Sequence, residues 1–342
     1  PWQPHRPCAW HVATGNDVRC GHHPCSAALP RRSGGLLNIV AIVGPTASGK
    51  SEVAEAAARR FDASIVSTDS MQAYRGMDIG TAKPSAAIRS EITYRMIDVA
   101  EPSEDFDVRT YQGLGRAAIE EEVAHRGRVI VCGGSGLHFR ALVDPMTFAP
   151  TDPAVRAELE AMELDDLVDR LLVSDPSAGE VVDLENPRRV IRAVEVEQLT
   201  GLTPTARATS PEAADVAGYR PLLSFAAVGI DPGVAVSVRV EARWEAMVAR
   251  GLVEEVAGLA DSLGRTARQA VGYKELIPVV RGDTTLAEAT EEVLSATMGL
   301  VKRQRTFFRR DPRIAWLAWQ DDRARRIDDA TAAIGEAAGW TS

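Results

Sequence analysis

The stretch that most constrains this chain is residues 44–51, which read Gly-Pro-Thr-Ala-Ser-Gly-Lys-Ser and match Gly, four residues, Gly-Lys-Ser. The apolar run 36–43 before it predicts a buried strand, and residues 51–61 after it predict a helix. In such a unit, backbone N–H groups surround phosphate oxygens and the helix N-terminus adds partial positive charge. We expect Lys50 to reach the outer phosphate and the Ser51 hydroxyl to bind Mg²⁺. The predicted anion-binding residues are Gly44, Pro45, Thr46, Ala47, Ser48, Gly49, Lys50 and Ser51.

The overall composition predicts a soluble globular protein, because 45% of its 342 residues are hydrophobic and 25% are charged. No apolar stretch is long enough to span a membrane. The formal net charge of −9 argues against nonspecific coating of nucleic acid, yet it leaves room for a local basic groove.

The first 35 residues differ in character from the rest. Their cysteines and histidines show no paired Cys-x-x-Cys spacing, and several prolines oppose regular structure, so zinc binding is not favoured. The stretch also lacks the features of a signal or transit peptide. We expect a disordered or spurious extension ahead of a body that begins near Leu36. One cysteine, Cys132, remains for that body and suits a reducing cytoplasm.

Two further predicted strands end in polar or glycine-rich sequence. The run 63–67 leads into Asp69, and the run 128–132 leads into Gly-Gly-Ser-Gly, which contains Ser135. The carboxyl ends of parallel strands meet at one edge of a sheet, so we expect both residues near the loop 44–51. The other predicted strands are 92–99, 222–230 and 314–319, and the other predicted helices are 108–126, 137–142, 236–263, 290–310 and 328–339.

These elements predict an α/β fold: a P-loop NTPase-like parallel sheet flanked by helices, with a helical insertion domain. Residues 144–220 lack an obvious buried strand and contain helix-like runs separated by prolines. We therefore divide the body into a first core segment 36–143, an insertion 144–220 and a second core segment 221–342.

From position alone, Asp69 fits a helix cap, an outer ligand of Mg²⁺ or a general base. Ser135 fits a hydrogen-bond donor better than an acylated nucleophile, because Leu137 stands where a nucleophile elbow needs glycine. Arg239 and Arg243 lie one helical turn apart, an arrangement suited to a highly charged diphosphate leaving group. Asp231 lies in Asp-Pro-Gly, which favours an ordinary turn over a metal ligand.

Several of these segments together resemble the tRNA dimethylallyltransferases, the enzymes that prenylate tRNA. The resemblance extends over about residues 39–317 and rests on the segments 44–51, 67–72, 74–84, 133–137, 186–190, 269–275 and 302–304. The segment Tyr-Arg-Gly-Met-Asp-Ile-Gly-Thr-Ala-Lys-Pro at 74–84 is the most specific of them.

The resemblance implies transfer of a dimethylallyl group from dimethylallyl diphosphate to N6 of the adenosine 3′-adjacent to the anticodon. Asp69 matches the family's base and Arg243 its catalytic arginine, while Ser135, Lys50 and Arg239 lie with Mg²⁺ around the diphosphate. The helical insertion would grip the anticodon stem of the tRNA, and the protein would act as a cytoplasmic monomer. The implied tRNA contacts are Asp69, Ser70, Met71, Gln72, Arg188, Arg189, Val190, Ile191, Arg192, Val271, Gly272, Tyr273, Lys274, Glu275, Lys302 and Arg303.

The chain departs from the family pattern at Tyr94-Arg95, where a His pair is usual, and at Met298-Gly299, where basic residues are usual. Three alternatives remain open: a small-molecule P-loop kinase that binds ATP, an inactive RNA-binding module, and an enzyme that prenylates free AMP. A kinase would need an arginine-bearing lid and has no use for a long helical insertion.

Overall fold

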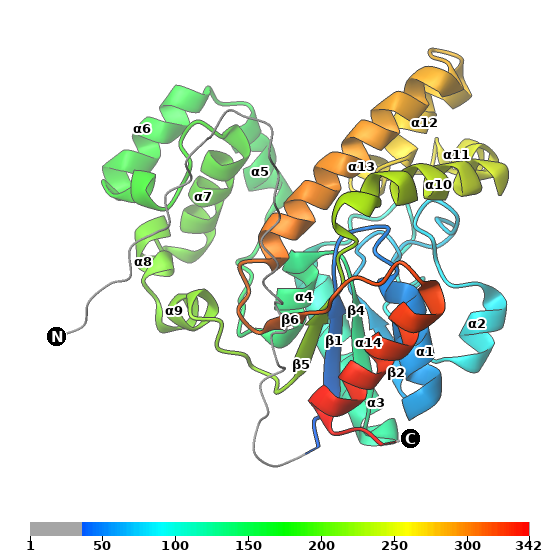
Figure 1. Ribbon diagram of the computed structural model, residues 1–342. Coiled ribbons are helices and arrows are strands. Elements are labelled where there is room, and N and C mark those ends of the chain that lie inside the picture. Colours follow the sequence, from blue (N-terminus) through cyan, green and yellow to red (C-terminus); the bar gives the residue numbers. More distant parts are fainter. Residues whose placement is uncertain (1–35, 342) are drawn as a thin grey trace, which may run out of the picture.

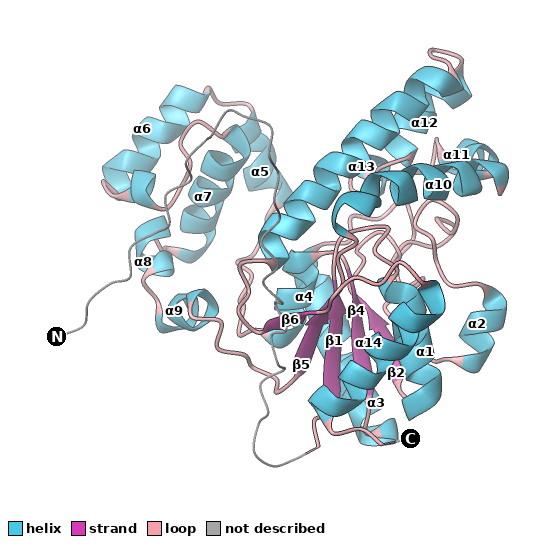
Figure 2. Ribbon diagram, viewed as in Figure 1, coloured by secondary structure: helices cyan, strands magenta, loops and turns pink. Residues whose placement is uncertain are grey.

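The computed structural model describes residues 36–341, so the predicted extension 1–35 lies outside the described residues. Its centre is a six-stranded sheet in the order β3-β2-β4-β1-β5-β6, in which every pair of neighbouring strands is parallel (Figure 1, Figure 2). The fold class predicted from the sequence is confirmed. The strands are β1 Ile39–Val43, β2 Ser64–Ser67, β3 Tyr94–Arg95, β4 Val129–Gly133, β5 Ala226–Gly229 and β6 Ile314–Trp316.

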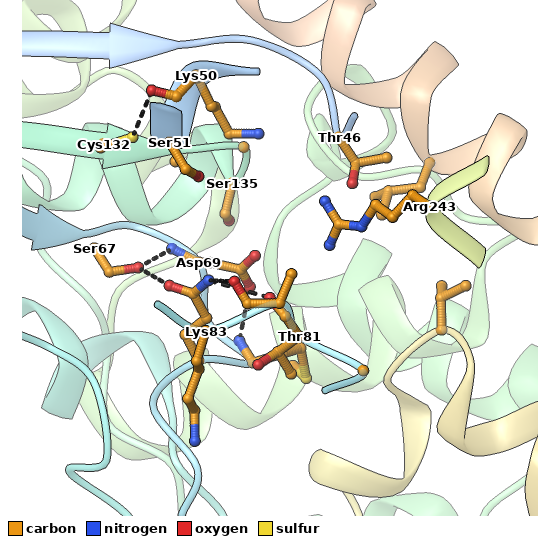
Figure 3. Close-up of a pocket in the computed structure, with 18 of the residues that line it drawn as sticks. Thr46, Lys50, Ser51, Ser67, Asp69, Thr81, Lys83, Cys132, Ser135 and Arg243 are labelled. Atoms are coloured by element: carbon orange, nitrogen blue, oxygen red, sulfur yellow. Dashed lines mark hydrogen bonds between the residues drawn. The ribbon is translucent and has the colours of Figure 1, made fainter. Parts of the chain in front are cut away.

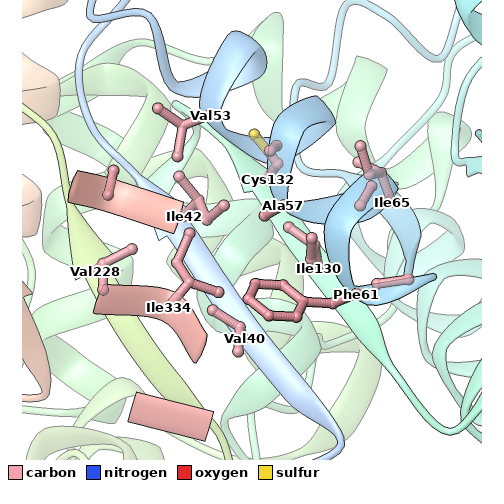
Figure 4. Packing of buried hydrophobic residues seen from close by; sticks show 14 of the residues in the cluster. Val40, Ile42, Val53, Ala57, Phe61, Ile65, Ile130, Cys132, Val228 and Ile334 are labelled. Carbon is pink, nitrogen blue, oxygen red and sulfur yellow. The ribbon is translucent and has the colours of Figure 1, made fainter. Parts of the chain in front are cut away.

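Helices cover both faces of this sheet. Val40 and Ile42 of β1 point to the face covered by α1 (Lys50–Phe61) and α14 (Arg323–Ala338), and Figure 4 shows them beside Phe61 and Ile334. The alternate residues of β1 pack on the other face with α3 (Val108–Arg126) and α4 (Gly136–Val143). A strand buried on both faces explains why the sequence there is continuously apolar.

The insertion is helical, as predicted, and has its own small apolar core (Figure 1). Proline stands at the start of four of its five α-helices, where its missing N–H costs nothing and its fixed φ suits the first turn. The helices are α5 Pro153–Glu160, α6 Leu164–Ser174, α7 Pro187–Thr200, α8 Pro204–Ala208 and α9 Pro211–Ala217, with a short 3₁₀ turn at Ala178–Glu180.

A second helical lobe packs above the carboxyl edge of the sheet and shares a core with residues 71–82 of the long loop after β2. It consists of α10 Val236–Ala249, α11 Leu252–Leu259, α12 Tyr273–Arg281 and α13 Leu286–Phe308, with 3₁₀ turns at Gly233–Ala235 and Ala267–Gln269. The single helix predicted over 236–263 is wrong. Gly251 has φ 97° between α10 and α11, and this left-handed conformation ends the first helix.

The other predicted helix and strand boundaries differ less from those in the structure. The strand predicted over 92–99 is reduced to β3, and a short helix, α2 (Ala86–Glu91), precedes it. Helix α13 begins at Leu286, four residues before the prediction, because Thr285 and Glu288 form a capping box there. Helix α14 likewise begins early, at Arg323, capped by Asp322. No helix among the described residues is long and apolar enough to cross a bilayer.

Candidate functional site

The loop between β1 and α1 has the geometry that its sequence predicts. Gly49 has φ 82° and is the N-cap of α1, so the helix N-terminus faces the loop. At Gly44 an added Cβ would lie 2.1 Å from the carbonyl oxygen of Ile230, so only glycine lets the loop pass β5 this closely. Ser48 is fully buried, and its hydroxyl has no hydrogen-bond partner. Of this loop and the first turn of α1, Thr46, Lys50 and Ser51 line the cavity described below.

Two side chains from the helical lobe hold this loop from outside. Gln304 of α13 accepts a hydrogen bond from Thr46 N at 2.8 Å, and Arg239 of α10 donates to Ala47 O at 2.6 Å. The Arg239 guanidinium also lies over the Trp319 ring, 5.2 Å from its centroid. The predicted pair Arg239 and Arg243 is therefore divided: Arg239 supports the loop, and Arg243 points into the cavity.

The cavity has a volume of about 880 Å³ and opens to solvent. Lys50, Ser51 and Ser135 line it together with Asp69, and Arg243 reaches in from the opposite side (Figure 3). Its other walls include polar groups of the 70–85 segment and apolar residues of the helical lobe. The structure thus brings all four predicted catalytic residues into one space.

Positive charge dominates the inner end of this cavity. The Lys50 ammonium donates to Pro45 O at 3.0 Å, and burial lowers the pKa of Lys50, with the charge of Arg243 adding to that effect. Burial likewise lowers the pKa of Arg243, against the attraction of Asp69. Two partly buried cations that line one cavity favour an anion bound between them.

Asp69 follows directly after β2, at the edge of the sheet. Its Oδ1 accepts a hydrogen bond from Met71 N at 3.0 Å, so the carboxylate is held in a turn while Oδ2 remains available. Ser67 donates to Gln72 Oε1 at 2.8 Å, and the Gln72 amide donates to Thr81 O at 3.1 Å. These bonds tie the end of β2 to the loop that follows it.

Ser135 stands at the N-terminus of α4, after β4. Its Oγ lies 2.7 Å from His138 Nδ1, and the two atoms share a hydrogen bond. The His138 ring packs edge-on against Tyr111 at 4.6 Å between centroids, and the Tyr111 hydroxyl donates to Ser67 O at 2.7 Å. Burial lowers the pKa of His138 to about 4, so its ring is neutral at neutral pH.

The residues predicted to contact tRNA fall into three groups. Ser70, Met71, Gln72, Val271, Gly272 and Arg303 line the cavity, while Arg188, Arg189, Lys274 and Lys302 are exposed.

The third group has five members, which make contacts within the protein. Val190 and Tyr273 have fully buried side chains, so the prediction that they contact tRNA is wrong for this conformation. Glu275 caps α12 by accepting from Gly272 N at 2.8 Å. Arg192 donates to the carbonyls of Ala149 and Pro150, and Ile191 packs in part on the core of the insertion.

Arg305 and Asp231, two residues to which the sequence assigned no site role, form an ion pair. Arg305 of α13 binds Asp231 with an N–O distance of 2.6 Å. Asp231 also accepts from Gly233 N at 3.0 Å, which confirms that it closes a turn.

Sequence reasoning gave no role to Gln304, His138 or Glu255. The carboxylate of Glu255 accepts hydrogen bonds from three consecutive N–H groups of the 74–84 loop, and it fixes that loop against α11. Only the spacing of Ser135 and His138, three apart at a helix start, left a signal that sequence reasoning could have used.

A strand, glycine loop and helix stand at the carboxyl edge of a parallel sheet, and Lys50 and Arg243 line one cavity there. This is an α/β protein with a helical insertion and a cavity suited to an anion. The family model described as IPP transferase matches residues 72–311. The chain belongs to this family, the tRNA dimethylallyltransferases.

Individual relatives agree with that assignment. The chain is 43% identical over 289 residues to the tRNA dimethylallyltransferase of Salinispora arenicola, covering 82% of each chain. It is also 43% identical over 327 residues to the tRNA dimethylallyltransferase of Acidothermus cellulolyticus, covering 92% of this chain and 96% of that one. The crystal structure of the full-length tRNA isopentenylpyrophosphate transferase of Bacillus halodurans is 33% identical, with a TM-score of 0.63 over 88% of this chain and 97% of its own.

Proposed function

We propose that this chain transfers the dimethylallyl group of dimethylallyl diphosphate to N6 of the adenosine 3′-adjacent to the anticodon of tRNA, releasing diphosphate. Family membership supports the reaction. The observation that carries it is the single cavity that holds Lys50, Arg243, Asp69 and Ser135. A cationic end suits a diphosphate, and a carboxylate facing the same space suits an amine that must lose a proton.

In this reaction the allylic carbon–oxygen bond breaks and its electron pair stays on the diphosphate. Negative charge therefore grows in the part of the cavity that Lys50, Ser51 and Arg243 line. Because both cations are partly buried, they interact with that charge more strongly than they would in water. Ser135 is placed to donate its hydroxyl proton to a diphosphate oxygen.

Mg²⁺ fits this end of the cavity as a bound cofactor. Ser51 lines the cavity at the first turn of α1, and the described residues contain no cluster of three or more His, Cys, Asp or Glu that would hold a metal alone. Magnesium sites of this kind use few protein oxygens and complete the shell with phosphate oxygens and water. The ion would supply further positive charge against the departing diphosphate.

In the same cavity, the N6 lone pair forms the new carbon–nitrogen bond. The N6 proton passes to Asp69, whose carboxylate is oriented by the bond from Met71 N. Adenine cannot present N6 while it is stacked in the anticodon loop, so the base must turn out of the stack to enter the cavity. Cavity-lining Ser70, Met71 and Val271 are proposed contacts for that nucleotide.

The tRNA phosphates are proposed to meet exposed basic side chains on two separate helices. Arg188 and Arg189 lie at the start of α7 in the insertion, and Lys302 and Arg303 lie on α13. These local charges act at short range, so the negative net charge of the chain does not oppose them strongly at physiological salt.

The test is incubation with radiolabelled dimethylallyl diphosphate, Mg²⁺ and either bulk tRNA or AMP. We expect label in tRNA, loss of transfer with EDTA, and a fall in kcat of at least about a hundredfold for Asp69→Asn. Asp328→Asn, an exposed carboxylate on α14 away from the cavity, is the matched control and should stay within a few-fold of the wild type. Transfer to AMP alone, or tighter binding of ATP than of dimethylallyl diphosphate by calorimetry, would contradict the proposal, the latter in favour of a kinase.

A further inference from the structure

The hydrogen bond between Ser135 and His138 constrains what Ser135 can do. A hydroxyl has one proton to donate, whereas an ionised diphosphate presents acceptors only. If Ser135 gives its proton to His138 Nδ1, it can only accept from the cavity and cannot stabilise the leaving group. If His138 carries its proton on Nδ1, that N–H donates to Ser135 Oγ and the hydroxyl proton remains free for the diphosphate.

We propose that His138 is a positioning residue for this reaction: its Nδ1–H holds Ser135 Oγ and directs the hydroxyl proton toward the diphosphate. The inference rests on the proposed function. It also rests on geometry, since Ser135 lines the cavity and lies 2.7 Å from Nδ1. The Tyr111 ring, packed edge-on against His138, restricts the imidazole to one orientation.

The surroundings of His138 favour this role over two others. Because the pKa of His138 is lowered to about 4, its ring is neutral at neutral pH and carries a proton on one nitrogen only. The tautomer therefore decides whether the Ser135 hydroxyl donates to His138 or to the cavity. Nucleophilic activation of Ser135 would require the opposite tautomer, with Nδ1 accepting the hydroxyl proton. Simple helix capping is also absent, because Ser135 makes no side-chain bond to the first turn of α4.

His138→Phe and His138→Asn separate positioning from packing. Phenylalanine keeps a ring against Tyr111 but has no donor, whereas the amide of asparagine can occupy the position of Nδ1 and donate to Ser135. We expect kcat to fall about ten- to a hundredfold in His138→Phe, with the KM for tRNA unchanged, and to recover substantially in His138→Asn. The control is a double-mutant cycle: in a Ser135→Ala background, His138→Phe should change kcat less than about twofold.

The outcomes separate the two levels of the argument. No transfer by the wild-type protein would remove the proposed function itself. If the wild type transfers normally and His138→Phe has the same kcat, only the positioning role is refuted. The positioning role is also refuted if His138→Phe lowers kcat in the Ser135→Ala background as much as it does in the wild type.

A second measurement does not depend on any variant folding. In ¹⁵N-histidine NMR spectra of the wild type with diphosphate and Mg²⁺ bound, His138 should be the neutral Nδ1–H tautomer. Finding the Nε2–H tautomer would overturn the proposal, because the hydroxyl proton would then be committed to His138.

Discussion

Glu255 anchors the loop that gives the sequence its most specific segment, and removing its carboxylate should be costly. The carboxylate accepts from Asp78 N at 2.9 Å, Ile79 N at 2.7 Å and Gly80 N at 3.0 Å, and it also accepts from the Tyr273 hydroxyl. Hydrogen bonds to a charged group contribute about 1.5–3 kcal/mol each. Since the loop N–H groups are only partly buried and regain water, we expect Glu255→Ala to lose about 3–5 kcal/mol in total.

The assay is urea unfolding followed by tryptophan fluorescence, with prenyl transfer measured on the same samples. Glu254→Ala is the matched control, because its side chain is exposed on the same turn of α11. Glu255→Gln should fall between the two, since one amide oxygen can still accept. The reasoning is refuted if Glu255→Ala unfolds within about 0.5 kcal/mol of Glu254→Ala, the range expected of an ordinary surface change.

Two further predictions concern packing and pH. At Gly136 an added Cβ would lie 2.0 Å from Phe307, so Gly136→Ala should destabilise the protein by about 1–3 kcal/mol in urea unfolding. Gly113→Ala, with open space around the added Cβ, should stabilise α3 by up to about 1 kcal/mol. Equal unfolding midpoints for the two variants would contradict this prediction. Burial acts to raise the pKa of Glu122, but bonds from Ser64 and Arg95 outweigh it and the pKa is lowered. A depressed carboxyl pKa stabilises the fold above the unfolded value of about 4.5 and loses that contribution as pH falls through the folded value. The stability gap between wild type and Glu122→Gln should therefore be full at pH 7 and shrink below about pH 4.5, while exposed Glu121→Gln shows little gap at either pH.

Local sequence predicted the elements that carry the reaction. Strand β1, the loop 44–51 and the start of α1 follow from one apolar run and fixed glycines within about 25 residues. The positions of Asp69 and Ser135 follow from a topological rule, because parallel strands end at one edge. The roles assigned to these residues came from resemblance and remain predictions.

Contacts between distant segments could not be predicted in the same way. Gln304 meets Thr46 across 258 positions and Glu255 meets Gly80 across 175, and neither pair leaves a periodic signal. The helix break at Gly251 could not be predicted for another reason. A lone glycine within a helical pattern is compatible with an uninterrupted helix, and tertiary packing determines whether the helix ends there. The start of α13 was within reach, since Thr285 and Glu288 form a capping box three residues apart.

The distant contacts also tie the glycine loop to the helical lobe. Thr46 N is already bonded to Gln304, and Ala47 O to Arg239, so part of the loop backbone is committed to α13 and α10. The same two helices carry Arg243 toward the cavity and exposed Lys302 toward the proposed tRNA. Any movement of α13 on binding RNA must therefore act on the loop through Gln304. Under the proposed function, such a site would couple the tRNA to the departing diphosphate, which a kinase with a separate lid over ATP does not require.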